Sequence, residues 1–124
     1  MNEKQVRKKL RELAEKAHEE ELRQALAPVA EAFERWRIKE VSSFEISDLI
    51  HEFHQGPSRT IWGTYTALKP DALVARAVAL GFLPREHVPP EMLASLAQRI
   101  DAYTPEDEQQ MQRDSSPRLR RDSE

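Results

Sequence analysis

The apolar residues of this sequence recur at intervals of three and four over most of its length. Only an α-helix turns that spacing into one continuous face, because each helical turn takes about 3.6 residues. Residues 2–27 show the pattern first, since Val6, Leu10 and Leu13 lead to Ala17 within a run of strong helix formers. No segment has the pattern of a credible strand. The sequence therefore predicts an all-α fold.

Local start and stop signals divide the remainder of the chain into shorter helices. Pro28 is expected to kink the first helix or to start a second one. Ser42 and Glu45 have the spacing of a capping box, which predicts a helix start. Gly56-Pro57 is expected to end that helix and to open the next one at a corner. The predicted helices after the first lie at 28–40, 43–54, 58–68, 71–80 and 91–103.

The predicted architecture is a compact bundle of about five helices, with a long helix before it and a tail after it. The long amphipathic helix occupies 1–27, and the helical core domain occupies 28–103. Residues 104–124 contain only Met111 and Leu119 as apolar residues. Because so little apolar surface cannot offset the entropy of ordering, this segment is expected to be a disordered tail.

Composition excludes several classes of function. The absence of cysteine excludes disulfides, thiolate metal sites and a cysteine nucleophile. A net charge of −3 gives no overall attraction to nucleic acid or to an anionic membrane. The three glycines are too few for a glycine-rich phosphate loop. No apolar run reaches the roughly 18–20 residues of a membrane span and no signal-peptide core is present, so a cytoplasmic protein without a membrane partner is expected.

Two histidines form the first candidate site. His51 and His54 lie three positions apart on a predicted helix, with Asp48 one turn before His51. A transition metal could use these three side chains, or the two histidines with a distant His18 or His87. The spacing is not that of the His-Glu-x-x-His motif. The alternative interpretation places both rings in the last turn of a helix, where partial positive charge suits the helix dipole. No cofactor is predicted.

The second candidate is an anion or ligand site after Pro57. A proline at a helix start leaves the following backbone N–H groups free, and Ser58, Arg59 and Thr60 could join them in holding an anion. The alternative is an ordinary helix cap followed by a solvated or ion-paired Arg59.

The third candidate is a helix-turn-helix formed by 43–54 and 58–68. The helix lengths fit, and the second helix would present Arg59 and Lys69 to nucleic acid. So few cations would bind DNA weakly, and Trp62 on the same helix is expected to be buried. The basic N-terminal helix is a second route to nucleic acid, although such charge runs are typical of a solvated face.

The segment 71–80 is the most apolar of the predicted helices, with Asp71 and Arg76 as its only charged residues. A helix that is apolar nearly all round lies at the centre of a fold or in an oligomer interface. The interface candidates are Leu73, Val74, Ala77, Val78 and Leu80.

The run from Ile50 to Arg59 resembles segments of short uncharacterised bacterial all-helical proteins. The resemblance extends to 75–89, which contains an alanine-rich helix, Gly81-Phe82-Leu83 and an acidic-proline turn. The resemblance covers about the middle half of the chain. It implies a recurring helical unit of bacterial origin and carries no activity with it.

These observations favour a protein–protein interaction or regulatory module that acts as a homodimer, with the N-terminal helix as a further route to a partner protein. One alternative is a nucleic-acid-associated regulator, which uses the helix pair or the basic N-terminus. The other is a small metal- or ligand-binding protein at His51, His54 and Arg59. No catalytic constellation stands out, so an enzyme is the less favoured interpretation.

Overall fold

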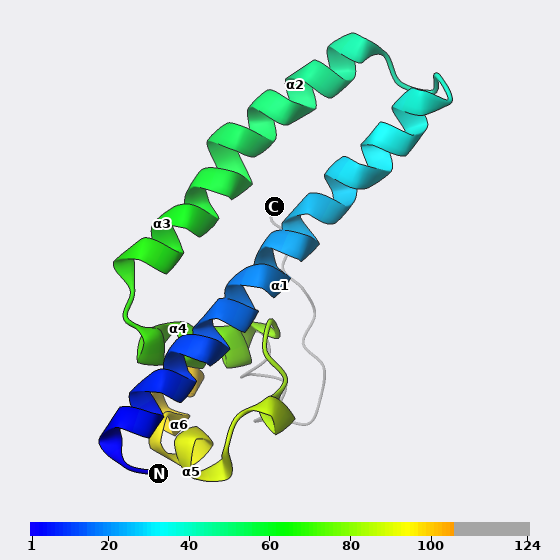
Figure 1. Cartoon of the computed structure of the whole chain (residues 1–124). Helices are drawn as coiled ribbons and strands as arrows, with labels where there is room; N and C mark the ends of the chain where they lie inside the picture. Colours follow the sequence, from blue (N-terminus) through cyan, green and yellow to red (C-terminus); the bar gives the residue numbers. More distant parts are fainter. Residues whose placement is uncertain (106–124) are drawn as a thin grey trace, which may run out of the picture.

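The protein is two long helical rods that lie antiparallel, with shorter helices gathered at one end (Figure 1). The structure is a computed structural model that describes residues 1–105. The first rod is α1 (Glu3–Arg37); the second comprises α2 (Ser43–Phe53), η1 (His54–Ser58) and α3 (Arg59–Ala67). The shorter elements are α4 (Pro70–Leu80), η2 (Arg85–His87), α5 (Pro90–Ser95) and α6 (Ala97–Tyr103). No strand occurs in the described chain, so the all-α prediction is confirmed.

Helix α1 is longer than the sequence signals indicated. Asn2 and Gln5 form a capping box at its start, and the helix then continues through Pro28 to Arg37. The second helical segment expected after Pro28 is therefore part of α1, and 27/28 is not a helix boundary. The helix ends with Lys39 in the left-handed region at φ 68°, which closes the tight turn into α2. The predicted tail lies outside the described residues from position 106 onward.

The corner predicted at Gly56-Pro57 is absent. Residues 54–58 form one wide π-helical turn instead, and backbone angles remain helical from α2 through η1 into α3. A wider turn relieves the clash between the proline ring and the preceding carbonyl, so the helix continues instead of breaking. We call the pair of rods, α1 against α2–η1–α3, the hairpin.

The hydrophobic core lies at one end of the hairpin, where α4 packs against both α1 and α6. Leu13 of α1 and Val74 of α4 are its largest fully buried side chains. Gly81 ends α4 in the left-handed conformation at φ 89°, as the sequence indicated. None of the described helices is both long and apolar enough to cross a membrane.

The far half of the hairpin, residues 25–53, lies beyond this core. Within that range only Ile46 is buried, at 7% exposure. In contrast, α1 buries Leu13, Ala14, Ala17 and Glu21 before it reaches this far half. The hairpin therefore extends about half its length away from the elements that stabilise it.

Candidate functional site

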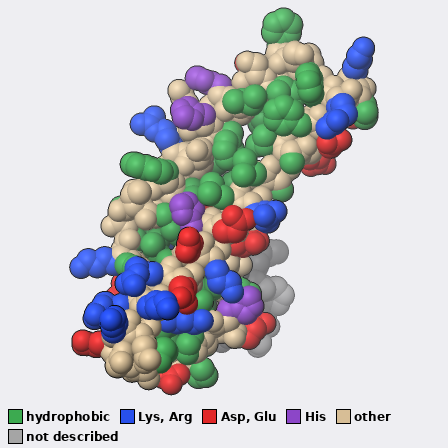
Figure 2. Space-filling view, in the orientation of Figure 1, with side chains coloured by type: hydrophobic (Ala, Val, Ile, Leu, Met, Phe, Trp, Pro, Cys, Tyr) green, Lys and Arg blue, Asp and Glu red, His purple; other side chains and the backbone are tan. Residues whose placement is uncertain are grey.

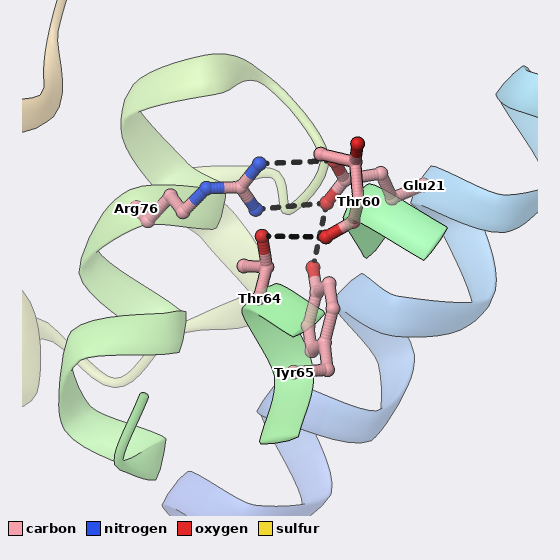
Figure 3. Close-up of polar contacts among 5 residues, drawn as sticks. All are labelled: Glu21, Thr60, Thr64, Tyr65 and Arg76. Carbon is pink, nitrogen blue, oxygen red and sulfur yellow. Dashed lines mark hydrogen bonds and ion pairs between the residues drawn. The ribbon is translucent and has the colours of Figure 1, made fainter. Parts of the chain in front are cut away.

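Glu21 is the one buried charged residue of the described chain, and it joins three helices (Figure 3). Its carboxylate accepts two hydrogen bonds from the Arg76 guanidinium on α4, at 2.8 and 3.0 Å. It also accepts a hydrogen bond of 2.9 Å from the Tyr65 hydroxyl on α3. Thr64 beside it donates to the Thr60 carbonyl within α3 and does not take part. The paired geometry of Arg76 is the strong form of ion pair between a guanidinium and a carboxylate.

Three aromatic rings lie close to this ion pair. The His18 ring stacks on Tyr65 at 4.2 Å between centroids with an interplanar angle of 4°. The Arg76 guanidinium lies 6.0 Å from the ring centroids of Tyr65 and of Phe82. Glu21 is itself buried, and hydrogen bonds are electrostatically stronger in a buried environment than in water.

Burial and hydrogen bonding act in opposite directions on the carboxylate. Burial raises the pKa of Glu21, but the hydrogen bonds from Arg76 and Tyr65 outweigh it and hold that pKa below its ordinary value. Burial and the hydrogen bond to Glu21 raise the pKa of the Tyr65 phenol. The hydrogen bonds to Glu21 also raise the pKa of Arg76. All three groups therefore keep their ordinary charges at neutral pH.

This cluster has the properties of a structural cross-link. No buried side-chain nitrogen or oxygen atom of residues 1–105 lacks a hydrogen-bond partner, which fits a cluster whose polar groups bind one another. The cluster cannot be recognised from local sequence patterns, because Glu21 and Arg76 are 55 positions apart. The available signal was the interruption of the apolar stripe of α1 at Glu20 and Glu21.

The metal candidates do not form a metal site. Asp48, His51 and His54 are all exposed along the second rod. No group of three or more His, Asp or Glu side chains within residues 1–105 is placed to hold a metal ion, with the distant His18 and His87 included in that range. The structure stacks His18 on Tyr65 instead.

The anion candidates Ser58, Arg59 and Thr60 lie inside a continuous helix. Ser58 makes no capping hydrogen bond, and the backbone before it is already helical. The premise of free N–H groups at a helix start is therefore not met.

The helix-turn-helix arrangement is also absent. Segments 43–54 and 58–68 belong to one rod, so there is no turn to set a recognition helix against its partner. Trp62 was expected to be buried, and this expectation was wrong: it is 68% exposed. In the basic N-terminal stretch, Arg7 pairs with Glu3 and Lys8 with Glu12 along the same helix.

The interface candidates on α4 lie mostly inside the chain. Four of them are between 0 and 8% exposed, and only Leu80, at 39%, reaches the surface. Contacts with α1 and α6 cover the other four residues, Leu73, Val74, Ala77 and Val78. The apolar character that suggested a dimer through this helix is accounted for by burial within one chain.

A different apolar surface lies on the far half of the hairpin. Leu26, Phe33 and Trp36 of α1 are 44, 36 and 41% exposed, and Ile50 of α2 is 49% exposed. The Phe33 and Trp36 rings meet edge to face, 6.1 Å between centroids. Figure 2 shows hydrophobic side chains gathered over the far halves of α1 and α2. We call these four residues the apolar face.

The apolar face is held in place by the turn between the rods. The Trp36 indole N–H donates to the Ser43 hydroxyl at 3.0 Å, which ties the end of α1 to the start of α2. Ser42 and Glu45 form the predicted capping box at that start, with hydrogen bonds of 2.7 and 3.1 Å. The surface is thus carried by two ordered helices.

Comparison of the chain with protein-family models, curated proteins and solved structures finds no match.

Proposed function

We propose that this protein is a protein–protein interaction module that self-associates through the apolar face of its hairpin. The observation that carries the proposal is the concentration of large exposed apolar side chains on the part of the hairpin that has almost no core of its own. Contiguous apolar patches on ordered helices mark interaction surfaces.

The spacing on α1 fits a helical partner. Leu26 and Phe33 are seven positions apart, which is about two turns, so they lie along one line of the helix. Two hairpins that bury such faces against each other form a four-helix bundle, in which each pair of helices completes the other's core. One hairpin alone cannot achieve this, because its two helices contact each other along a single side.

The charges that flank the apolar face favour a second copy over another protein. Arg23 pairs with Glu19 at 2.9 Å, and Arg37 pairs with Glu34 at 3.3 Å, both within α1. Because these flanking charges are already compensated, the surface offers no net charge for selecting a charged partner. An equally neutral apolar face is the matching surface, and the same face on another copy provides it.

The test is the mass in solution of the wild type and of the double variant Leu26→Gln/Phe33→Gln. Sedimentation equilibrium at micromolar to submillimolar concentration is expected to give a dimer for the wild type. The variant is expected to be a monomer with an unchanged helical circular dichroism spectrum, because both side chains are partly exposed and glutamine is a good helix former.

Trp62→Gln is the matched control, because it removes a larger exposed apolar side chain from outside the apolar face. The control variant should remain a dimer. The proposal would be overturned if the wild type were monomeric throughout the concentration range. It would also be overturned if the control variant dissociated as fully as the double variant.

A further inference from the structure

A second surface of the hairpin is a shallow groove between α1 and α2. Its floor is apolar and its volume is about 270 Å³. The lining residues are Ala32, Val41, Glu45, Ile46, Asp48, Leu49 and Glu52. This volume is smaller than the roughly 300–1,000 Å³ typical of pockets that enclose small molecules. An open apolar groove between two helices is better suited to the side of a third helix.

The groove continues a face that the fold itself covers with helices. Ala32 is eighteen positions beyond Ala14, about five full turns, so both lie on the same side of α1. At Ala14 that side is buried in the core that α4 completes. At Ala32 no further element of residues 1–105 reaches it, and the floor of the groove remains open. The occupant that fits at Ala32 is therefore a helix, just as the helix α4 covers this side of α1 at Ala14.

The charge on the groove selects among helices. Glu45, Asp48 and Glu52 lie along its edge, and no basic residue lines it. Glu45 caps its own helix, but no hydrogen bond or ion pair engages the carboxylates of Asp48 and Glu52 within the described chain. The nearby Arg35 is paired with Glu40 at 3.2 Å. Two free carboxylates thus border an apolar floor.

We infer that this acid-edged groove binds an amphipathic helix of a partner protein that carries lysine or arginine beside its apolar stripe. Its apolar side chains lie on the floor formed by Ile46 and Leu49, and its cations meet Asp48 and Glu52. The acidic edge from Glu45 to Glu52 extends about 10 Å along α2, which matches about two turns of the bound helix.

This binding does not depend on self-association. Ile50 follows Ile46 by about one turn of α2, so the apolar face adjoins the groove, but none of the four residues of the apolar face lines it. The variant Leu26→Gln/Phe33→Gln should therefore keep its affinity for the helix.

The experiment is a fluorescence anisotropy titration of the full chain with two labelled peptides of about 15 residues, long enough for helical structure. Both carry leucine at helical spacing; one has lysine and the other glutamate on the flanking positions. The lysine peptide is expected to bind, and to bind more weakly as salt is raised. The double variant Asp48→Lys/Glu52→Lys should lower the affinity for the lysine peptide about tenfold or more. The neutral variant Asp48→Asn/Glu52→Gln should lower that affinity by less.

Glu15→Lys/Glu86→Lys is the control, because it makes the same change in net charge at exposed residues away from the groove. This control variant should bind the lysine peptide within about twofold of the wild type. The inference would be overturned if the glutamate peptide bound as well as the lysine peptide, or if the lysine peptide did not bind. It would also be overturned if the control and groove variants lost affinity for the lysine peptide equally. Circular dichroism confirms that each variant retains its helices.

Discussion

At the scale of single residues, one buried carboxylate joins three helices. Glu21 receives hydrogen bonds from Arg76 and Tyr65, and so fixes α1 against α4 and α3 together. The side chains of Glu21 and Arg76 are 11 and 16% exposed, so neither can recover its lost contacts from water if its partner is removed. The other ion pairs within the described chain are far more exposed and contribute less to stability.

Glu21→Gln is therefore expected to lower the free energy of unfolding by about 2–3 kcal/mol, because Arg76 keeps a buried charge without its counter-ion. Urea unfolding monitored by circular dichroism measures it. Glu19→Gln, which breaks the exposed pair with Arg23, should cost at most about 1 kcal/mol.

The same pair predicts a pH dependence. The folded-state pKa of Glu21 is lowered, so its stabilisation is fully present above the ordinary value of 4.5 and is lost as the pH falls through the lower folded-state value. The difference in stability between wild type and Glu21→Gln should shrink in that acidic range. A difference that stays constant down to pH values below the folded-state pKa would contradict the assignment.

At the scale of the elements, two long rods tolerate prolines in different ways. Pro28 lies in the regular helix α1, where it lacks an N–H to donate to the Gln24 carbonyl. Pro57 lies in the π-helical turn η1, whose wider spacing accommodates the ring. Both prolines are exposed, so their replacement removes no buried packing.

Pro28→Ala is expected to raise the free energy of unfolding by about 1–2 kcal/mol, because alanine restores the helical hydrogen bond without the ring. Pro57→Ala should raise it by less, since η1 already relieves the clash. Thermal and urea unfolding of both variants compare the gains. If Pro57→Ala raises the free energy of unfolding by as much as Pro28→Ala or more, then η1 does not relieve the clash of the proline ring.

At the scale of the whole molecule, stability is distributed unevenly. The core formed by α1, α4 and α6 lies at one end, and the far half of the hairpin buries only Ile46 (Figure 1). The two surfaces proposed for interaction, the apolar face and the acid-edged groove, both lie in this far half. An interaction that covers either surface would supply the packing that the chain itself does not.

Hydrogen exchange is therefore expected to be graded along α1. At low protein concentration, amides at 29–36 should exchange faster than amides at 12–20 of the same helix, because local opening costs less where few side chains are buried. Mass spectrometry of peptic fragments resolves the two ranges. Protection at 29–36 should increase with protein concentration if the hairpin self-associates, and equal protection along α1 at low concentration would contradict the gradient.

The sequence by itself determined the all-α class, the capping box of Ser42 and Glu45, and the end of the apolar helix at Gly81. These features depend on interactions within a few positions of the chain, such as caps, helical spacing and local apolar density. Only the tertiary structure decided that α1 continues through Pro28, that Gly56-Pro57 makes no corner and that Trp62 is exposed. Whether an apolar stripe becomes core or surface depends on which distant helix covers it. Here α4 reaches Ala14 but not Ala32, and that difference placed both candidate surfaces on the far half of the hairpin.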